Sequence, residues 1–198
     1  VERRWSQEID GIKQILATQN KIVVVDIDGV LNTYPACFLD WVKQQNGPTL
    51  SLASKISDPM IWENYKHQYR ISGAKRLVPV RSGAKHLLEF LSKDLNMFIV
   101  VATNRPVSRY VNLYSDTLHW LETNELPFDY IYWADWDEKI IGLSDLLPNI
   151  HLVIDDNENI CKQFQTQGIQ TFRVSAEISL EEVVELWRTS GQQIFGNS

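Results

Sequence analysis

The stretch Lys21-Ile-Val-Val-Val-Asp-Ile-Asp-Gly-Val-Leu31 decides the fold. Ile22 to Val25 form an apolar run without alternation, which is typical of a strand buried on both faces of a parallel sheet. Asp26 and Asp28 follow where this strand should end, and residues two apart on extended backbone point to the same side. Gly29 allows a sharp turn after them. Because ligands bind beyond the carboxyl ends of strands in open α/β sheets, the two carboxylates predict a functional site.

Downstream of this strand, helices alternate with further apolar strands. Alternating β and α elements predict a parallel sheet with helices on both faces, which is a Rossmann-like three-layer α/β fold. Asn157 is expected to cap the helix that follows it, and Gly168 to mark the end of that helix. The elements that we expect are strand 21–27, helix 82–94, strand 97–102, helix 107–123, strand 130–133, helix 136–147, strand 151–154, helix 157–167, strand 169–174 and helix 179–190.

Residues 32–78 interrupt this alternation. They predict one helix after Pro35 and a second, aromatic helix around Trp62, but no sheet strand. About 45 residues exceed an ordinary connection, so we expect a small helical cap inserted after the first strand, above the two acids. The expected division of the chain is an N-terminal helix in 1–20 packed on the core, an α/β core in 21–31 and 79–190, the cap in 32–78, and a tail in 191–198.

Composition excludes several classes of protein. The net charge of −6 and the pI near 5.2 argue against a broad nucleic-acid-binding surface. No run of about 18 apolar residues exists, so no membrane span is expected. Cys37 and Cys161 fit no metal or redox spacing, which favours thiols in a reducing compartment. Residues 1–6 lack the apolar core of a signal peptide. We therefore expect a cytoplasmic protein that acts on a small molecule; the oligomeric state stays open.

Polar side chains follow several of the expected strands. Because parallel strands bring their carboxyl ends to one edge, these groups are expected to converge there although they are far apart in sequence. Converging carboxylates need a cation, and hard oxygen ligands suit Mg²⁺. With one lysine and one hydroxyl beside it, such a site could bind a phosphoryl group. The groups concerned are Asp26, Asp28, Thr103, Lys139, Asp155 and Asp156.

These parts predict phosphoryl chemistry. Asp26 can attack phosphorus and form an aspartyl-phosphate. Asp28 can protonate the leaving oxygen and later deprotonate the attacking water. Because neighbouring like charges raise one pKa, we expect a protonated partner beside an ionised one. Lys139 would stabilise charge on the phosphoryl oxygens, and Thr103 would position one of them.

The sequence resembles the haloacid-dehalogenase-like (HAD) hydrolases. Asp26-Ile-Asp28-Gly29-Val30-Leu31 is similar to the first motif, and Thr103-Asn104, Lys139 and Asp155-Asp156 are similar to motifs two to four, in the family's order. The resemblance covers residues 21–175 and implies an Mg²⁺-dependent phosphatase or phosphotransferase. It implies that Mg²⁺ is held by Asp26, the backbone carbonyl of Asp28 and a fourth-motif carboxylate, with Asp156 favoured over Asp155. An acid at position 28 implies phosphatase rather than dehalogenase activity.

The position and the residues of the insertion resemble those of one branch of this family. A cap after the first motif, the aromatic segment 62–70 and the Asp-Asp fourth motif resemble the 5′(3′)-deoxyribonucleotidase branch, which implies a nucleoside monophosphate as substrate. The second half of the chain also resembles the 3′-phosphatase domain of phage-type polynucleotide kinases. A polynucleotide 3′-phosphatase, a sugar phosphatase and a noncatalytic nucleotide-binding or scaffold module remain alternatives.

Substrate contacts are expected from the cap and from the end of strand 97–102. Tyr34, Trp62 and Tyr65 could stack on a base or sugar, although aromatic residues at helical spacing also pack in cores. Asn104 and Arg105 could contact the phosphate or the sugar. The basic residues Arg70, Lys75, Arg76 and Arg105 could meet a second phosphate or form a solvated face.

Overall fold

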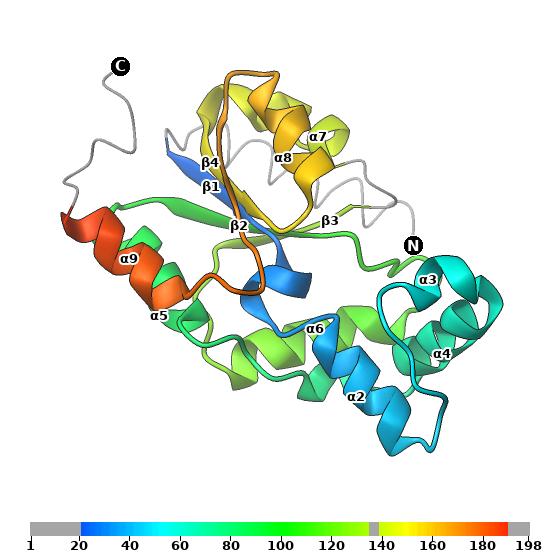
Figure 1. Ribbon diagram of the computed structural model, residues 1–198. Helices are drawn as coiled ribbons and strands as arrows, with labels where there is room; N and C mark the ends of the chain where they lie inside the picture. Colours follow the sequence, from blue (N-terminus) through cyan, green and yellow to red (C-terminus); the bar gives the residue numbers. More distant parts are fainter. Residues whose placement is uncertain (1–20, 135–138, 190–198) are drawn as a thin grey trace.

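A five-stranded parallel sheet lies at the centre of the protein (Figure 1). The computed structural model describes residues 21–134 and 139–189. The strand order is β3-β2-β1-β4-β5, so β1 is central and is paired with β2 and β4. The sheet confirms the predicted Rossmann-like α/β fold. The strands are β1 (Ile22–Val25), β2 (Phe98–Thr103), β3 (Tyr130–Trp133), β4 (Ile150–Asp155) and β5 (Gln170–Arg173).

Helices cover both faces of the sheet, which makes three layers (Figure 1). Val23 and Val25 of β1 belong to one apolar cluster, while Ile22 and Val24 belong to a second cluster on the opposite face. All four side chains are at most 1% exposed, which explains why the strand lacks a polar alternation. The first cluster packs under α5 (Ala84–Glu89), α6 (Asn112–Thr123) and α9 (Leu180–Thr189), and the second under α8 (Glu158–Gln165).

Several helices differ from their predicted extents. The predicted helix 82–94 is α5 followed by a π-helical turn, η3 (Phe90–Asp94). The predicted helix 107–123 begins only at Asn112, because a hydrogen-bonded turn from Pro106 to Tyr110 precedes it. Of the predicted helix 136–147, the described part consists of α7 (Lys139–Gly142) and the 3₁₀ helix η4 (Ser144–Asn149).

Glycine is a weak helix former, and Gly142 stands where the predicted helix 136–147 breaks. Asn157 caps α8 as predicted, since its side chain accepts a hydrogen bond from the backbone N–H of Asn159. The predicted helix in 1–20 and the tail 191–198 lie outside the described residues. Every helix within the described ranges is too short or too polar to cross a bilayer.

The chain turns sharply after Asp26. The backbone N–H of Asp26 still bonds to the carbonyl of Ile154 at 2.9 Å, and the turn η1 (Ile27–Leu31) then leads away from the sheet. Gly29 has a φ of +95°, which is a left-handed conformation that glycine adopts without strain. The Arg81 guanidinium fixes the turn by donating to the carbonyl of Gly29 at 2.8 Å.

Four short helices occupy the segment in which the sequence predicts a cap. The segment leaves and rejoins the core at one place, because an antiparallel bridge joins Asn32 to Val80 and Arg81 N–H bonds to the carbonyl of Leu31 at 2.9 Å. No strand of the sheet lies between these two points. The helices are α2 (Ala36–Gln44), α3 (Ser54–Ser57), α4 (Pro59–Ile71) and η2 (Ala74–Leu77).

Aromatic side chains hold these helices together. The Phe38 ring of α2 lies 5.0 Å from the Trp62 ring and 5.3 Å from the Tyr69 ring of α4, measured between ring centroids. Such pairs contribute about 0.5–1.5 kcal/mol beyond the burial of their area. On the core side, the Trp120 indole of α6 donates a hydrogen bond to the carbonyl of Val78 at 2.7 Å. The helical segment is therefore packed onto the core through its returning end.

Candidate active site

The strand ends and the cap helices together line a cavity of about 380 Å³. Its lining contains every catalytic and metal-ligand candidate from the sequence, which are Asp26, Asp28, Thr103, Lys139, Asp155 and Asp156. The convergence expected from the parallel sheet is thus present in the structure.

Lys139 joins two strand ends at the floor of this cavity. Its ammonium group is 2.5 Å from Oδ1 of Asp26 and 2.7 Å from Oδ2 of Asp155. The lysine side chain is only 1% exposed. A buried lysine is tolerated when its charge is paired. Here one ammonium group is paired with two carboxylates, Asp26 after β1 and Asp155 at the end of β4. The three side chains of this triad are at most 9% exposed.

Burial sets the protonation of the triad. It raises the pKa of Asp26 to about 8, because desolvation and the carboxylates of Asp155 and Asp156 outweigh the charge of Lys139. Burial by itself would lower the pKa of Lys139, but the charges of Asp26 and Asp155 outweigh it and raise that pKa. Lys139 therefore stays a cation, and Asp26 needs further positive charge to be fully ionised at neutral pH.

The two fourth-motif carboxylates differ in their contacts. Asp155 uses one oxygen for Lys139 and the other to accept the backbone N–H of Asn157 at 2.9 Å. Asp156 faces Gly29, where an added Cβ would lie 2.2 Å from its Oδ2 atom. Burial and the charge of Asp155 raise the pKa of Asp156 to about 6. Asp156 is therefore the carboxylate that is left for a further ligand.

The donor set fits one hard divalent cation. The fit rests on the Asp26 and Asp156 carboxylates and on the absence of a side chain at Gly29, which leaves room for Asp156 beside the first turn. Within residues 21–134 and 139–189, no three His, Cys, Asp or Glu side chains are grouped as a metal site. The candidate ligand set thus consists of two carboxylates and, following the resemblance, the carbonyl of Asp28.

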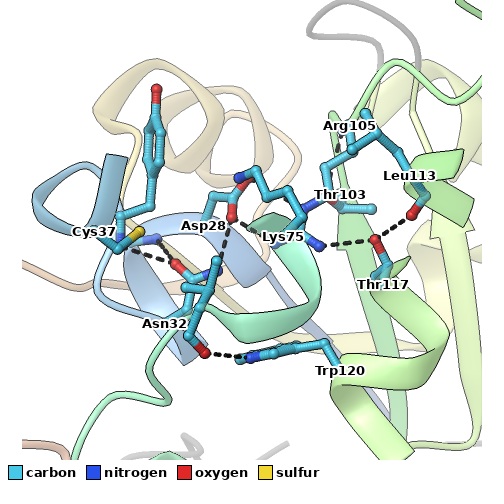
Figure 2. Close-up of polar contacts among 12 residues, drawn as sticks. Asp28, Asn32, Cys37, Lys75, Thr103, Arg105, Leu113, Thr117 and Trp120 are labelled. Atoms are coloured by element: carbon cyan, nitrogen blue, oxygen red, sulfur yellow. Dashed lines mark hydrogen bonds and ion pairs between the residues drawn. The ribbon is translucent and has the colours of Figure 1, made fainter. Parts of the chain in front are cut away.

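The Asp28 side chain is held by two cations and one amide from three parts of the chain (Figure 2). Lys75 of η2 is 2.8 Å from its Oδ2 atom, and Arg105 is 2.7 Å from its Oδ1 atom. Asn32 donates a further hydrogen bond at 2.7 Å. Arg105 is itself anchored, because it donates to the Thr117 hydroxyl at 2.7 Å.

The charge on Asp28 differs from the sequence-based expectation. We expected one carboxylate with a raised pKa and one with an ordinary pKa, and the predicted role of Asp28 as the acid requires Asp28 to be the protonated one. Burial by itself would raise the pKa of Asp28, but the charges of Arg105 and Lys75 outweigh it and hold that pKa well below its usual value. Asp26 has the raised pKa instead. That expectation was wrong because the sequence did not identify Lys75 and Arg105 as partners of Asp28.

Thr103 and Asn104 lie at the end of β2. Thr103 is 1% exposed, and its hydroxyl accepts the backbone N–H of Arg105 at 3.3 Å. The Nδ2 atom of Asn104 is buried and has no hydrogen-bond partner among the described residues. Both residues line the cavity. An unpartnered amide donor beside a cavity is suited to an oxygen of a bound ligand.

The aromatic candidates separate into two groups. Tyr34 lines the cavity, as does Tyr69, and the Lys75 ammonium lies 4.7 Å from the centroid of the Tyr34 ring. Trp62 does not line the cavity; it is 1% exposed and packs against Phe38. Tyr65 also lies away from the cavity, with its ring near Gly47. For Trp62 and Tyr65 the stacking interpretation is corrected, since both pack inside the cap.

Among the charged residues that line the cavity, sequence reasoning missed Lys55 and Lys66. Exposed lysines are common, so neither residue was distinguishable from a solvated charge. The spacing of Lys66 and Arg70, four residues apart on one helix, could have pointed to a shared basic face. Of the other basic candidates, Arg76 does not line the cavity and lies 3.6 Å from Asp116.

Solved structures of known proteins share this fold. A candidate beta-phosphoglucomutase from Thermotoga maritima superposes with a TM-score of 0.59 at 17% identity, covering 85% of this chain and 99% of that one. A structure described as a dehalogenase has a TM-score of 0.58 at 11% identity, covering 85% and 97%. A HAD-superfamily hydrolase of subfamily IA from Geobacter sulfurreducens has a TM-score of 0.50 at 16% identity, covering 84% and 95%. No family model and no curated protein sequence matches the chain. This chain therefore shares the α/β fold of these structures, one of which is described as a HAD-superfamily hydrolase.

We expect Gly29→Ala to disturb the site more than a matched glycine substitution. An alanine at the φ of +95° is strained by about 1–2 kcal/mol, and its Cβ would also displace the Asp156 carboxylate. Gly73→Ala is the control, because Gly73 has a φ of +76° with nothing within 4 Å of an added Cβ. Urea unfolding and Mg²⁺ titration calorimetry should show a similar strain in both variants, but weakened Mg²⁺ binding in Gly29→Ala alone. Equal Mg²⁺ affinities would contradict the proximity of Asp156 to this turn.

The raised pKa of Asp26 predicts a pH-dependent stability. Between pH 3.8 and about 8 the folded state binds a proton that the unfolded state lacks, so the free energy of unfolding falls as the pH rises through this range. Asp26→Asn removes that titration. In EDTA we expect its Tm to be near that of the wild type at pH 5 and higher than that of the wild type at pH 9.

Circular dichroism melts at both pH values measure this effect, and Asp40→Asn serves as the control because Asp40 is exposed on α2. A Tm difference between Asp26→Asn and the wild type that is the same at pH 5 and pH 9 would show that Asp26 has an ordinary pKa.

Proposed function

We propose that this chain is an Mg²⁺-dependent phosphomonoester hydrolase that acts through a phosphorylated Asp26. The observation that carries the proposal is the Lys139 contact: one buried ammonium group bridges Asp26 and Asp155 on the floor of a cavity that Asp156 and Thr103 also line. A carboxylate nucleophile, a fixed cation and a free carboxylate for a metal are the groups that phosphoryl transfer needs.

Asp26 is the proposed nucleophile. One of its oxygens is held by Lys139, which leaves the other free to attack phosphorus. Asp26, Asp156 and the carbonyl of Asp28 would hold Mg²⁺, which supplies positive charge that favours the ionised nucleophile and offsets the charge of the phosphoryl group. Lys139 orients Asp26 and faces the oxygens that gain charge. Thr103 and the unpartnered amide of Asn104 provide hydrogen bonds to the same oxygens.

Asp28 is the proposed acid and base. Its ionised form is suited to take a proton from the water that releases the phosphoryl group from Asp26. For the first half-reaction it must be protonated, and Arg105 and Lys75 oppose this while they contact it. A phosphoryl group is itself an anion and would compete for these two cations. The arrangement supports a role in which substrate binding raises the pKa of Asp28.

The fold supports the class of reaction. Structures that share it are described as a phosphoglucomutase, a HAD hydrolase and a dehalogenase. The acid at position 28 favours phosphate ester hydrolysis over dehalogenation, following the sequence resemblance.

A nucleoside monophosphate is the proposed substrate. Tyr34 and Tyr69 line the cavity and offer aromatic surface to a base or sugar. Trp62 and Tyr65 do not contact the proposed substrate, because both side chains pack in the cap. A polynucleotide 3′-phosphate end and a sugar phosphate remain the alternatives.

We expect Asp26→Asn to abolish Mg²⁺-dependent phosphate release from p-nitrophenyl phosphate and nucleoside monophosphates. Loss of Asp28 as acid and base should lower kcat by about 10²–10⁴-fold in Asp28→Asn. Asp40→Asn removes an exposed carboxylate of the same cap and should keep wild-type rates. Phosphate release with Mg²⁺ and with EDTA measures all three variants.

Two outcomes would contradict the proposal. Unchanged turnover in Asp26→Asn would remove the nucleophile assignment. Absence of release from every ester, with the folded wild-type protein and Mg²⁺, would instead favour a noncatalytic binding module. Phosphate release from sugar phosphates alone would support phosphomonoester hydrolysis but would replace the nucleoside monophosphate by a sugar phosphate as the substrate.

A further inference from the structure

The cap side of the cavity carries three cations that the proposed reaction does not use. Lys55 lies on α3, and Lys66 and Arg70 lie on α4. All three line the same cavity as Asp26 and Asp28. We call these three residues the cap cations.

The cap cations lack the acidic partners that the core cations have. Within residues 21–134 and 139–189, no carboxylate lies within 4.0 Å of the Lys55 or Lys66 ammonium group, and Arg70 reaches Glu63 only at 4.0 Å. By contrast, Lys75 is bound to Asp28 at 2.8 Å. The cap therefore presents to the cavity two lysines without a carboxylate partner among the described residues, and one arginine whose carboxylate partner is distant.

The positive charges of Lys66 and Arg70 are held close together although their mutual repulsion is unfavourable. Lys66 and Arg70 are four residues apart on α4, and like charges at that spacing destabilise a helix. Burial, followed by the charge of Arg70, lowers the pKa of Lys66. An anion between these residues would remove both penalties.

Arg70 is also held in place. Its guanidinium lies 5.3 Å from the centroid of the Tyr110 ring, and its backbone carbonyl accepts a hydrogen bond from Asn112 at 2.7 Å. Its side chain is 17% exposed, so most of it is packed rather than solvated. A fixed arginine beside a half-buried lysine resembles a binding surface more than a solvated helix face.

We propose that Lys55, Lys66 and Arg70 bind a second phosphate of the substrate, distinct from the one transferred to Asp26. This inference rests on the proposed function and specifies its substrate class: a phosphomonoester that carries one further phosphate group, such as a nucleoside 3′,5′-bisphosphate. The net charge of −6 argues against an extended nucleic-acid track, so the second phosphate belongs to a small molecule.

Matched substrates test the inference. The kcat/KM is measured for a nucleoside 5′-monophosphate, for the corresponding 3′,5′-bisphosphate, and for a dinucleotide with a terminal 3′-phosphate. We expect the bisphosphate to exceed the monophosphate by about tenfold or more, since a charge-assisted contact contributes about 1.5–3 kcal/mol.

Variants identify the residues. Lys66→Gln, alone and with Lys55→Gln, should reduce the ratio of bisphosphate to monophosphate kcat/KM by about tenfold, mainly through KM, and Lys66→Arg should restore most of it. Lys43→Gln is the matched control, because Lys43 is an exposed lysine of α2 away from the cavity. Thermal melts verify that each variant is folded. An unchanged ratio in Lys66→Gln overturns the inference.

The remaining outcomes are also distinct. If the dinucleotide has a higher kcat/KM than the bisphosphate, the inference that the second phosphate belongs to a small molecule is overturned. If no substrate is hydrolysed, the proposed function fails, and calorimetric binding of the bisphosphate and of inorganic phosphate to wild type and Lys66→Gln decides this inference. Tighter binding of the bisphosphate that is lost in Lys66→Gln supports it; equal binding of both ligands, or none, overturns it.

Discussion

The site depends on one buried ion cluster, in which Lys139 contacts Asp26 and Asp155. Removing Lys139 would leave the buried Asp155 carboxylate without its counter-charge, at a cost of about 3–5 kcal/mol. The cluster ties α7 to the ends of two neighbouring strands, so it fixes the direction of the Asp26 side chain, the proposed nucleophile, as well as its charge. The Asp26 carboxylate resists full ionisation without additional positive charge, because burial raises its pKa. In the metal-free fold, stability favours a protonated Asp26, whereas the proposed reaction requires an ionised Asp26.

A second polar cluster connects the cap segment to the core. Lys75 belongs to the end of the helical insertion, whereas Asp28 and Arg105 follow core strands, and all three meet in one hydrogen-bonded group (Figure 2). The position of the insertion and the charge state of Asp28 are consequently linked. Any movement that separates Lys75 from Asp28 removes one of the two cations that keep this carboxylate ionised.

The sequence predicted the sheet, the turn after Asp26 and the convergence of six polar residues, because buried parallel strands are apolar throughout and their carboxyl ends share an edge. It did not predict which aromatic residues face the cavity: Trp62 and Tyr34 look alike in a periodic pattern, and only the packing against Phe38 separates them. It also gave the wrong charge for Asp28, since Lys75 lies 47 residues away and a buried lysine has no signature in the chain. Pairwise contacts across the insertion are set by packing, which local patterns do not encode.

The bridge between Asn32 and Val80 has an evolutionary consequence. Both ends of the helical insertion meet there, so its length can change at little cost in loop entropy and without shifting the register of the sheet. Under the proposed function, the segments that determine substrate preference and those that carry the reacting groups are then encoded in parts of the gene that can diverge at different rates. Lineages could exchange one set of helices for another and inherit the nucleophile unchanged, provided that a new partner for Asp28 replaces Lys75.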